Sequence, residues 1–310
     1  MSIPKNQHWV PRFYLKHFAT PETRDKKNPK VWIFDKESDG PPRLVDVKTQ
    51  CAKRYLYSPI KDNGERNLFL EKMLGRLEES LAPEWFSLAN DCLYISKDDP
   101  FRKGISLFVS AMILRNPDTR IELEKSYQEI IKFIQEVPDI NEIQAIDING
   151  KIHDFNLDDW DRFLNRKPND HHKFFTDYVF SNIRKIAEQL LEKRWSIIFS
   201  DKPSFITSDK PVSINHLTKE KFGVDFGLGT EGSFVIFPIS PHRLLVMDDR
   251  HEEPEWQYYA PDDNRFGLYN FLIWKNSRRL MISSRDINEV LREIDDEFSE
   301  LHDDKQANSL

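Results

Sequence analysis

The sequence has little glycine, only two cysteines and no long apolar run, and each shortage excludes a class of protein. Ten glycines in 310 residues form neither a G-x-G-x-x-G nor a G-x-x-x-x-G-K-S/T loop, so dinucleotide-binding and P-loop sites lack support. The motifs H-E-x-x-H and G-x-S-x-G are also missing, which removes the zinc-protease helix and the nucleophile elbow. The two cysteines, Cys51 and Cys92, make neither a disulfide framework nor a cysteine-based metal site plausible.

Apolar residues are nowhere concentrated enough to form a membrane span. The longest mostly apolar stretch, residues 105–114, is about half of the roughly 20 residues that a transmembrane helix needs. The first residues lack the apolar core of a secretory signal. We therefore expect a cytoplasmic protein with reduced cysteines and no membrane partner.

Charge is unevenly distributed along the chain, whose net charge is −7. Residues 1–54 hold twelve Lys or Arg against six acids, whereas residues 286–310 hold nine acids against two bases. A basic region of this kind can bind a phosphate backbone or pack against the acidic segment of the same chain. The intramolecular contact is the simpler expectation, because non-specific nucleic-acid binding normally draws on a positive field.

Apolar residues at helical spacing predict several helices in the first two-thirds of the chain. Leu70, Leu74, Leu81 and Trp85 recur along one face of a helix, with charged residues between them. A later helix must end before Pro117, which forbids its continuation. The helices expected on these grounds are residues 11–18, 67–90, 99–115, 117–137 and 169–194.

Short β-branched segments punctuated by Asp, Pro and Gly follow, a pattern typical of antiparallel strands. The expected strands are residues 195–199, 204–207, 212–215, 233–237, 243–247 and 280–283. Helices are expected at residues 262–275 and 286–302. Helices grouped before strands predict an α+β fold, in which a helix-rich N-terminal two-thirds packs on a mainly antiparallel sheet from the C-terminal third.

Two predicted hairpins complete the expected secondary structure. Strands at residues 30–35 and 44–48, separated by a turn-rich segment, predict a small N-terminal hairpin. A second hairpin, around Asn149-Gly150, is flanked by polar linker. We expect residues 1–310 to form a single α+β domain, with a lobe boundary near residues 138–156.

The most distinctive segment, residues 6–18, places polar and aromatic side chains where a chain end is usually frayed. Pro11 biases the residue before it toward extended backbone and suits the first position of a helix. On that helix Pro11, Tyr14, Leu15 and Phe18 share one face, which predicts a contact with the core.

His8 precedes this helix, and Arg12 lies in its first turn. One interpretation is structural, with His8 as a hydrogen-bonded anchor of the chain terminus. The other is functional, with His8 as a metal ligand or general base beside Arg12. The sequence leaves both interpretations open.

The segment resembles the opening of the domain-of-unknown-function family 4238, whose His-x-x-Pro-x-x-Tyr-Leu-x-x-Phe signature is matched from His8 to Phe18. Further matches are the helix that carries Glu71 and Glu78, and residues 111–117, 205–212 and 237–241. The family more often has Asn than the Lys found here at position 210. The resemblance spans most of the chain and supports the fold, but the family name implies no activity.

The tetrapeptide Ser-Asp-Lys-Pro occurs twice, beginning at Ser200 and at Ser208. Turn chemistry accounts for much of this pattern, since Asp and Ser side chains bond nearby backbone N–H groups and Pro ends a strand. The family resemblance falls on Asp209 and not on Asp201. Asp209 is therefore the stronger functional candidate of the two.

If the first helix packs on the C-terminal sheet and brings His8 near Asp209, the expected catalytic residues are His8, Arg12, Arg115 and Asp209. His8, Glu78 and Asp209 would bind Mg²⁺ or Mn²⁺, since an imidazole and two carboxylates can hold a divalent metal. Arg115 would stabilise charge on a transferred phosphoryl group. The simpler alternatives are that Arg115 caps its helix and that Glu78 faces solvent or pairs with a lysine.

The resulting hypothesis is a metal-dependent nucleic-acid hydrolase, similar to a nuclease, with nucleic acid as its partner. We associate this activity with bacterial defence, although no residue carries that association. The competing hypothesis is a non-catalytic binding or sensor module whose N-terminal polar cluster is structural. The sequence identifies no protein partner.

Overall fold

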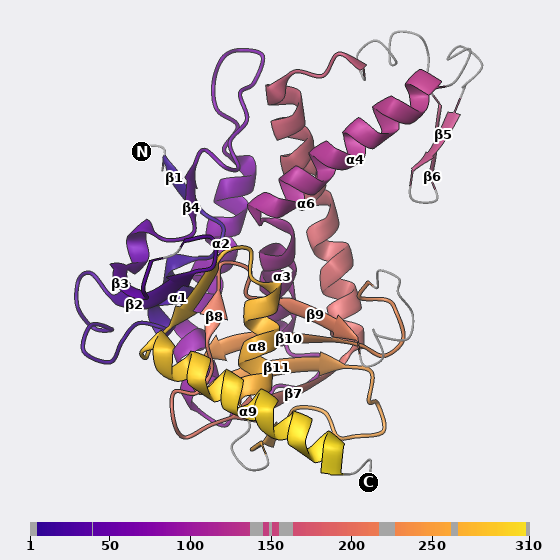
Figure 1. Cartoon of the computed structure of the whole chain (residues 1–310). Coiled ribbons are helices and arrows are strands. Elements are labelled where there is room, and N and C mark those ends of the chain that lie inside the picture. Colours follow the sequence, from indigo (N-terminus) through magenta and orange to yellow (C-terminus); the bar gives the residue numbers. More distant parts are fainter. Residues whose placement is uncertain are drawn as a thin grey trace.

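The structure is a computed structural model that describes residues 5–38, 40–136, 145–148, 151–154, 164–216, 227–261 and 266–307. It has an α+β fold, in which helices dominate the first two-thirds of the chain and mainly antiparallel sheets gather the later strands (Figure 1). This confirms the predicted fold class. The expected turn at Asn149-Gly150 and most of the expected boundary near residues 138–156 lie outside the described residues.

The N-terminal helices lie close to the ranges predicted from apolar spacing. They are α1 (Arg12–His17), α2 (Phe69–Asn90), α3 (Pro100–Leu114), α4 (Pro117–Glu136) and α6 (Pro168–Glu192). The Asp99 side chain caps α3 by accepting a hydrogen bond from the Phe101 N–H at 2.8 Å, a stabilising arrangement at a helix start. Among the described residues, none of the helices combines the length and apolar character that crossing a membrane requires.

The larger sheet has the strand order β12-β7-β11-β10-β9. Its strands, in chain order, are β7 (Arg194–Phe199), β9 (Ser213–His216), β10 (Ser233–Ser240), β11 (Arg243–Asp248) and β12 (Gln257–Tyr259). Neighbouring strands are antiparallel except for β12, which runs parallel to β7. The central strands β10 and β11 are buried along nearly their whole length, which indicates that both faces of the sheet are covered.

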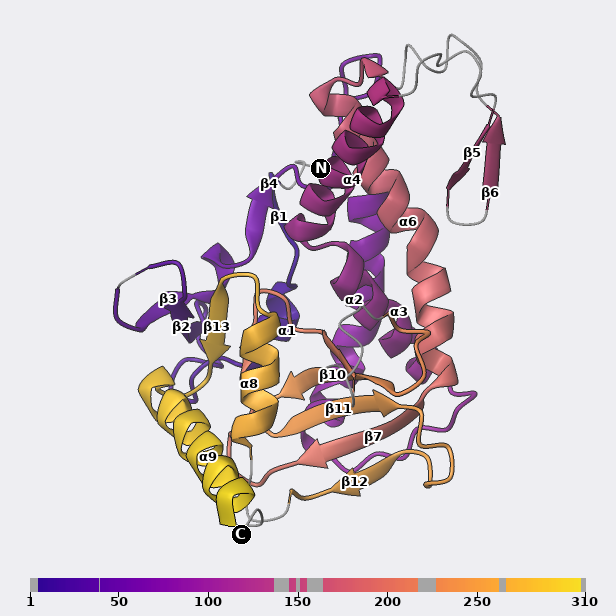
Figure 2. The same cartoon turned by 45° about the vertical axis from the view of Figure 1, so that its right-hand side comes forward.

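Successive side chains of a strand point to opposite faces of the sheet, so the core is divided between these two faces. On β10, Val235, Phe237 and Ile239 pack on the side of α2 and α3, whereas Ile236 packs on the opposite side. The opposite side is covered by α8 and α9. The bounds of these helices are Gly267–Asn276 and Ile287–Ala307. The result is three layers, helices on sheet on helices, which can be followed in Figure 2.

The predicted N-terminal hairpin is present, and it belongs to a second sheet. The hairpin consists of β2 (Lys30–Asp35) and β3 (Arg43–Asp46). The strand β13 (Leu280–Ser283) pairs with the free edge of β2, and β8 (Thr207–Ser208) pairs with β13. This four-stranded antiparallel sheet therefore joins early and late parts of the chain.

Two short ribbons complete the described strands. In the first, β1 (Asn6–His8) pairs antiparallel with β4 (Ala52–Arg54), so that His8 lies opposite Ala52. In the second, β5 (Ala145–Ile148) pairs with β6 (Lys151–Asp154), beyond the end of α4 (Figure 1). The β1–β4 ribbon borders the site described below.

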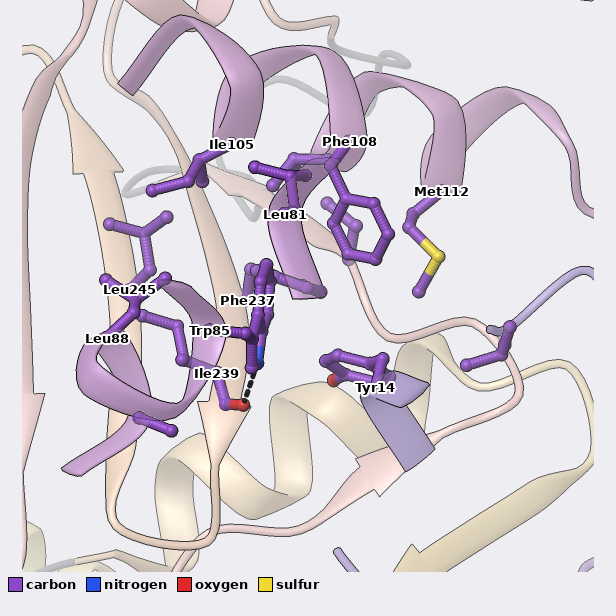
Figure 3. Packing of buried hydrophobic residues seen from close by; sticks show 14 of the residues in the cluster. Tyr14, Leu81, Trp85, Leu88, Ile105, Phe108, Met112, Phe237, Ile239 and Leu245 are labelled. Carbon is purple, nitrogen blue, oxygen red and sulfur yellow. Dashed lines mark hydrogen bonds between the residues drawn. The ribbon is translucent and has the colours of Figure 1, made fainter. Parts of the chain in front are cut away.

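Tyr14 fastens α1 to the larger sheet, as the sequence predicts. Its ring stacks on Phe237 with centroids 5.3 Å apart, and its hydroxyl donates to the Pro238 carbonyl oxygen at 2.7 Å. Trp85 and Phe108 pack around the same two rings, and Figure 3 shows all four in one cluster. The first helix therefore lies against the C-terminal sheet, which fixes the position of the segment that precedes it.

Candidate functional site

The start of the chain is anchored by a buried glutamine on β1. Gln7 donates from Nε2 to the Ser58 hydroxyl at 2.7 Å and accepts at Oε1 from the Tyr57 N–H, also at 2.7 Å. The Tyr57 hydroxyl donates to the Arg115 carbonyl oxygen at 2.8 Å. These bonds tie β1 to the C-terminal end of α3 and hold the residues around them in fixed positions.

His8 follows on β1 and is partly buried. Its Nε2 lies 3.1 Å from the Lys48 carbonyl oxygen. Because a carbonyl oxygen can only accept, Nε2 carries the proton and Nδ1 is the proton acceptor of the ring. Burial lowers the pKa of His8, and the charges of Arg12 and Arg115 lower it further, while the bond to Lys48 opposes the change. At neutral pH the imidazole is therefore uncharged and able to accept a proton.

Arg115 is the C-cap residue of α3, and its side chain is 1 % exposed. Its Nε donates to the Trp9 carbonyl oxygen at 2.8 Å, and its Nη1 donates to Glu78 at 2.7 Å. Its Nη2 is also buried, and within the described part of the chain it has no hydrogen-bond partner. A buried donor without a partner is costly, so a ligand oxygen that reached it would be stabilised. Glu78 pairs with this arginine, and not with a lysine as the simpler alternative proposed.

Glu71 lies seven residues before Glu78, a spacing that places both side chains on the same face of α2. Burial raises the pKa of Glu71 from its ordinary value of 4.5 to about 7; the negative charge of Glu78 adds to the rise, and Arg115 opposes it. The carboxyl group is therefore close to half protonated at neutral pH. The sequence analysis named Glu71 in the helix that resembles the family but did not place it among the site residues. Its spacing from Glu78 was visible, but the loss of surrounding water depends on distant segments.

These side chains line one cleft with a volume of about 290 Å³, here called the polar cleft. Its lining residues are His8, Arg12, Phe13, Glu71, Leu74, Gly75, Glu78, Glu79, Ala82 and Arg115. The structure thus brings together His8, Arg12, Glu78 and Arg115, four residues selected from the sequence. Gly75 adds no side chain to the wall, and a Cβ at this position would meet no heavy atom within 4 Å. The glycine therefore helps to keep the cleft open.

Asp209 is not among the residues that line the polar cleft. It is 1 % exposed, and its two carboxylate oxygens accept hydrogen bonds from the Arg279 N–H at 3.1 and 3.0 Å. Its carbonyl oxygen accepts from Trp9 Nε1 at 2.9 Å and from Asn116 Nδ2 at 3.0 Å. Burial raises the pKa of Asp209, opposed by backbone N–H groups that include that of Arg279. The residue thus connects the N-terminal segment, the α3–α4 turn and the start of β13.

The metal ligands expected from the sequence are divided by this arrangement. His8 and Glu78 line the polar cleft, whereas Asp209 is buried and is not among the residues that line it. Within the residues that the structure describes, no three His, Cys, Asp or Glu side chains are grouped to hold a metal ion. The cleft offers the carboxylates of Glu78 and Glu79 instead. Mg²⁺ commonly takes one or two protein carboxylates together with substrate phosphates, so these residues fit that mode of binding.

Comparison with known proteins identifies a family but no activity. A family model described as "Protein of unknown function (DUF4238)" matches residues 6–286. The matched interval contains the β1–β4 ribbon, the polar cleft and Asp209. Searches of curated proteins and of solved structures found no match to the chain.

Proposed function

This chain belongs to the DUF4238 family of proteins of unknown function, and we propose that it is a nuclease-like hydrolase of phosphodiester bonds that works in the polar cleft. One observation carries the proposal: the partly protonated carboxyl group of Glu71 and the uncharged imidazole of His8 line the same cleft. A general acid or base works best when its pKa lies near the working pH. Both protonation states that acid–base cleavage requires are therefore populated at neutral pH.

In the proposed reaction, Nδ1 of His8 takes the proton of the attacking hydroxyl group while the new bond between oxygen and phosphorus forms. The bond between phosphorus and the leaving oxygen breaks, and that oxygen takes the proton of the Glu71 carboxyl group. Negative charge develops on the phosphoryl oxygens, where Arg12 and Arg115 would stabilise it. The Nη2 of Arg115 has no partner among the described residues but is buried, so a phosphoryl oxygen would contact it only after the cleft wall shifts.

RNA is the substrate that such a pair serves most directly. The ribose 2′-hydroxyl lies beside the phosphate and can itself attack, with the advantage of an intramolecular reaction. The bond to the 5′-oxygen then breaks and leaves a 2′,3′-cyclic phosphate. DNA has no 2′-hydroxyl, so its hydrolysis would need an attacking water molecule. We therefore expect RNA to be cleaved faster than DNA.

The charges of the polar cleft also favour a protonated Glu71. With Glu71 neutral, the positive charges of Arg12 and Arg115 balance the negative charges of Glu78 and Glu79. Ionisation of Glu71 would add a negative charge that repels a phosphate. The protonated carboxyl group therefore serves both as the acid and as part of the charge balance.

Mg²⁺ or Mn²⁺ remains a predicted cofactor. The carboxylates of Glu78 and Glu79 are the cleft residues that would hold such an ion beside a substrate phosphate. The ion would neutralise charge on the phosphoryl group. The assay must therefore include both metals and a chelator.

The test is cleavage of labelled single-stranded and duplex RNA and DNA in Mg²⁺, in Mn²⁺ and in EDTA. We expect RNA cleavage that is faster in Mg²⁺ or Mn²⁺ and persists at a lower rate in EDTA. We expect His8→Gln and Glu71→Gln each to lower kcat/KM by at least about 100-fold, since a general acid or base commonly contributes that much. Glu84→Gln is the matched control, because Glu84 is exposed on α2 outside the cleft. Circular dichroism and unfolding curves establish that each variant is folded.

Three other results would change the proposal. Wild-type activity in both His8→Gln and Glu71→Gln would remove the polar cleft from the chemistry. Cleavage that requires Mg²⁺ or Mn²⁺ and is lost in Glu78→Gln would favour the metal-dependent mechanism expected from the sequence. Nucleic-acid binding without cleavage would favour the non-catalytic module, in which the hydrogen bonds of Gln7 and His8 are purely structural. The association with bacterial defence remains a prediction outside this assay.

A further inference from the structure

A second groove lies on the other side of the β1–β4 ribbon from the polar cleft. It has a volume of about 320 Å³ and is here called the basic groove. Its polar and aromatic lining residues are Trp9, Lys53, Arg120, Glu124 and Arg278. Successive side chains of extended backbone point in opposite directions, so His8 faces the polar cleft and Trp9 faces the basic groove. The carbonyl oxygen of Trp9 accepts from Arg115 Nε at 2.8 Å, so the two sites adjoin across one backbone segment.

The basic groove continues along α4 into a larger hollow of about 590 Å³. The two share Arg120, Ile121 and Glu124, and the charged residues that the hollow adds are Lys125, Glu129 and Lys132. From residue 120 to residue 132 the helix rises by about 18 Å at roughly 1.5 Å per residue. The positive charges are therefore distributed along a track that is long enough for an extended chain.

The charges of this track are only partly neutralised by the protein. Glu124 pairs with Arg120 at 2.9 Å, and Arg278 pairs with an aspartate of α4 at 2.6 Å. The remaining cations are the exposed lysines Lys53, Lys125 and Lys132. In the part of the chain that the structure describes, none of these three lysines forms an ion pair. Glu129 also lines the hollow, between Lys125 and Lys132 on the same helix. The five cations Lys53, Arg120, Lys125, Lys132 and Arg278 therefore exceed the three acids Glu124, Glu129 and Asp118 by two charges, in a protein whose net charge is −7.

We propose that the basic groove binds single-stranded nucleic acid, with phosphates along the three lysines and a base against Trp9. The Trp9 ring is partly exposed, and its Nε1 donates to the Asp209 carbonyl oxygen at 2.9 Å, which holds the ring in place. Single-strand binding proteins combine such aromatic surfaces with a positively charged groove that follows the backbone. A duplex keeps its bases stacked inside and offers none to Trp9, so single strands are the expected ligand.

This inference rests on the proposed function, because a strand held in the basic groove would lie next to the polar cleft, across the backbone of Trp9. The two sites have complementary properties. The polar cleft holds acid and base groups in nearly balanced charge, which provides little attraction for a polyanion. The basic groove provides that attraction, since phosphate contacts with lysine and arginine dominate nucleic-acid affinity.

Binding can be measured apart from cleavage by fluorescence anisotropy. The probe is a short fluorescein-labelled 2′-O-methyl RNA, whose blocked 2′-hydroxyl prevents the proposed reaction, studied in EDTA at several salt concentrations. We expect the triple variant Lys53→Gln, Lys125→Gln and Lys132→Gln to raise Kd by about tenfold or more at low salt and to weaken its salt dependence. The matched control removes three exposed lysines outside the groove, Lys97, Lys103 and Lys185, and should leave Kd unchanged.

Equal Kd values for the two triple variants would overturn the assignment, as would wild-type protein that binds no probe. Tighter binding of a duplex of the same sequence would overturn the choice of single strands. The catalytic proposal fails separately. If the predicted binding is found but unmodified RNA is not cleaved, the basic groove stands and the acid–base mechanism falls. If both triple variants cleave RNA at the same rate, the acid–base mechanism stands and the role of the basic groove falls.

Discussion

At the scale of single residues, Glu71 shows how environment determines chemistry. The helix α2 carries several glutamates, and apolar spacing alone does not show that the pKa of Glu71 is raised. In the fold Glu71 is partly buried near Glu78 and Arg115, and its pKa rises to about 7. The elements that bury it, including the segment of His8, come from elsewhere in the chain. Its reactivity is therefore a tertiary property that the local pattern could not predict.

We predict that Glu71→Gln stabilises the protein at neutral and alkaline pH but not in acid. Between pH 4.5, the ordinary pKa, and about 7, the folded value, the folded protein binds more protons than the unfolded chain. The free energy of unfolding of the wild type therefore falls as pH rises through this window. Glutamine cannot ionise and avoids this loss. The gain should be near zero at about pH 4 and on the order of 1 kcal/mol above about pH 7.5, because partial exposure reduces the effect.

Urea unfolding of the wild type and Glu71→Gln across this pH range measures the difference. Glu84→Gln again serves as control, since its side chain is exposed. A gain that does not depend on pH would show that Glu71 is not the titrating group. A variant that is less stable at alkaline pH would contradict the raised pKa directly.

At the scale of elements, local patterns in the sequence predicted the helices. They did not predict strand pairing, which depends on residues far apart in the chain. The helix expected at residues 67–90 is α2 (Phe69–Asn90), because apolar spacing is a local signal. The ribbon strand β1 was not predicted, since its three polar residues show no alternation and its partner lies far along the chain. The strand expected at residues 204–207 begins only at Thr207. The Ile206 N–H donates to the Asn270 side chain at 3.1 Å, and not to a neighbouring strand.

Asp209 also depends on distant partners, because its hydrogen bonds connect the end of β8 to the start of β13. We predict that Asp209→Ala lowers the free energy of unfolding by about 1–3 kcal/mol, since the Arg279 N–H then loses its carboxylate acceptors. Cleavage per folded molecule should remain within about twofold of the wild type. Chemical denaturation and kinetics on the same preparation measure both quantities. Lost cleavage with unchanged stability would instead make Asp209 the catalytic residue that the sequence predicted.

At the scale of the whole molecule, the site exists because separate parts of the chain are fastened together. Tyr14 attaches α1 to the larger sheet, and β13 attaches the N-terminal hairpin to the C-terminal region. The family signature and helix spacing selected His8, Arg12, Glu78 and Arg115, which do line one cleft. The pairing of strands and the burial of side chains depend on residues that are far apart in the sequence. For that reason the burial of Asp209 outside the lining of the cleft, and the existence of the basic groove, required the structure.

The central claim, that the polar cleft is the place of the chemistry, can be tested at Gly75. This glycine lies on the cleft-lining face of α2, where an added Cβ would meet no heavy atom within 4 Å. A leucine there should improve helix propensity and leave the free energy of unfolding unchanged or raised by up to about 1 kcal/mol. Its side chain would also occupy part of the roughly 290 Å³ cleft. Glu84→Leu, on the exposed side of the same helix, controls for an added leucine.

The decisive measurement is kcat/KM of Gly75→Leu for single-stranded RNA, relative to the wild type. With the substrate excluded from the cleft, we expect a loss of at least about tenfold in a protein that is no less stable, since small displacements of bound substrate already reduce rates by about 100-fold. Glu84→Leu should retain wild-type activity. A stably folded Gly75→Leu variant that cleaves RNA as fast as the wild type would place the reaction elsewhere and contradict the claim.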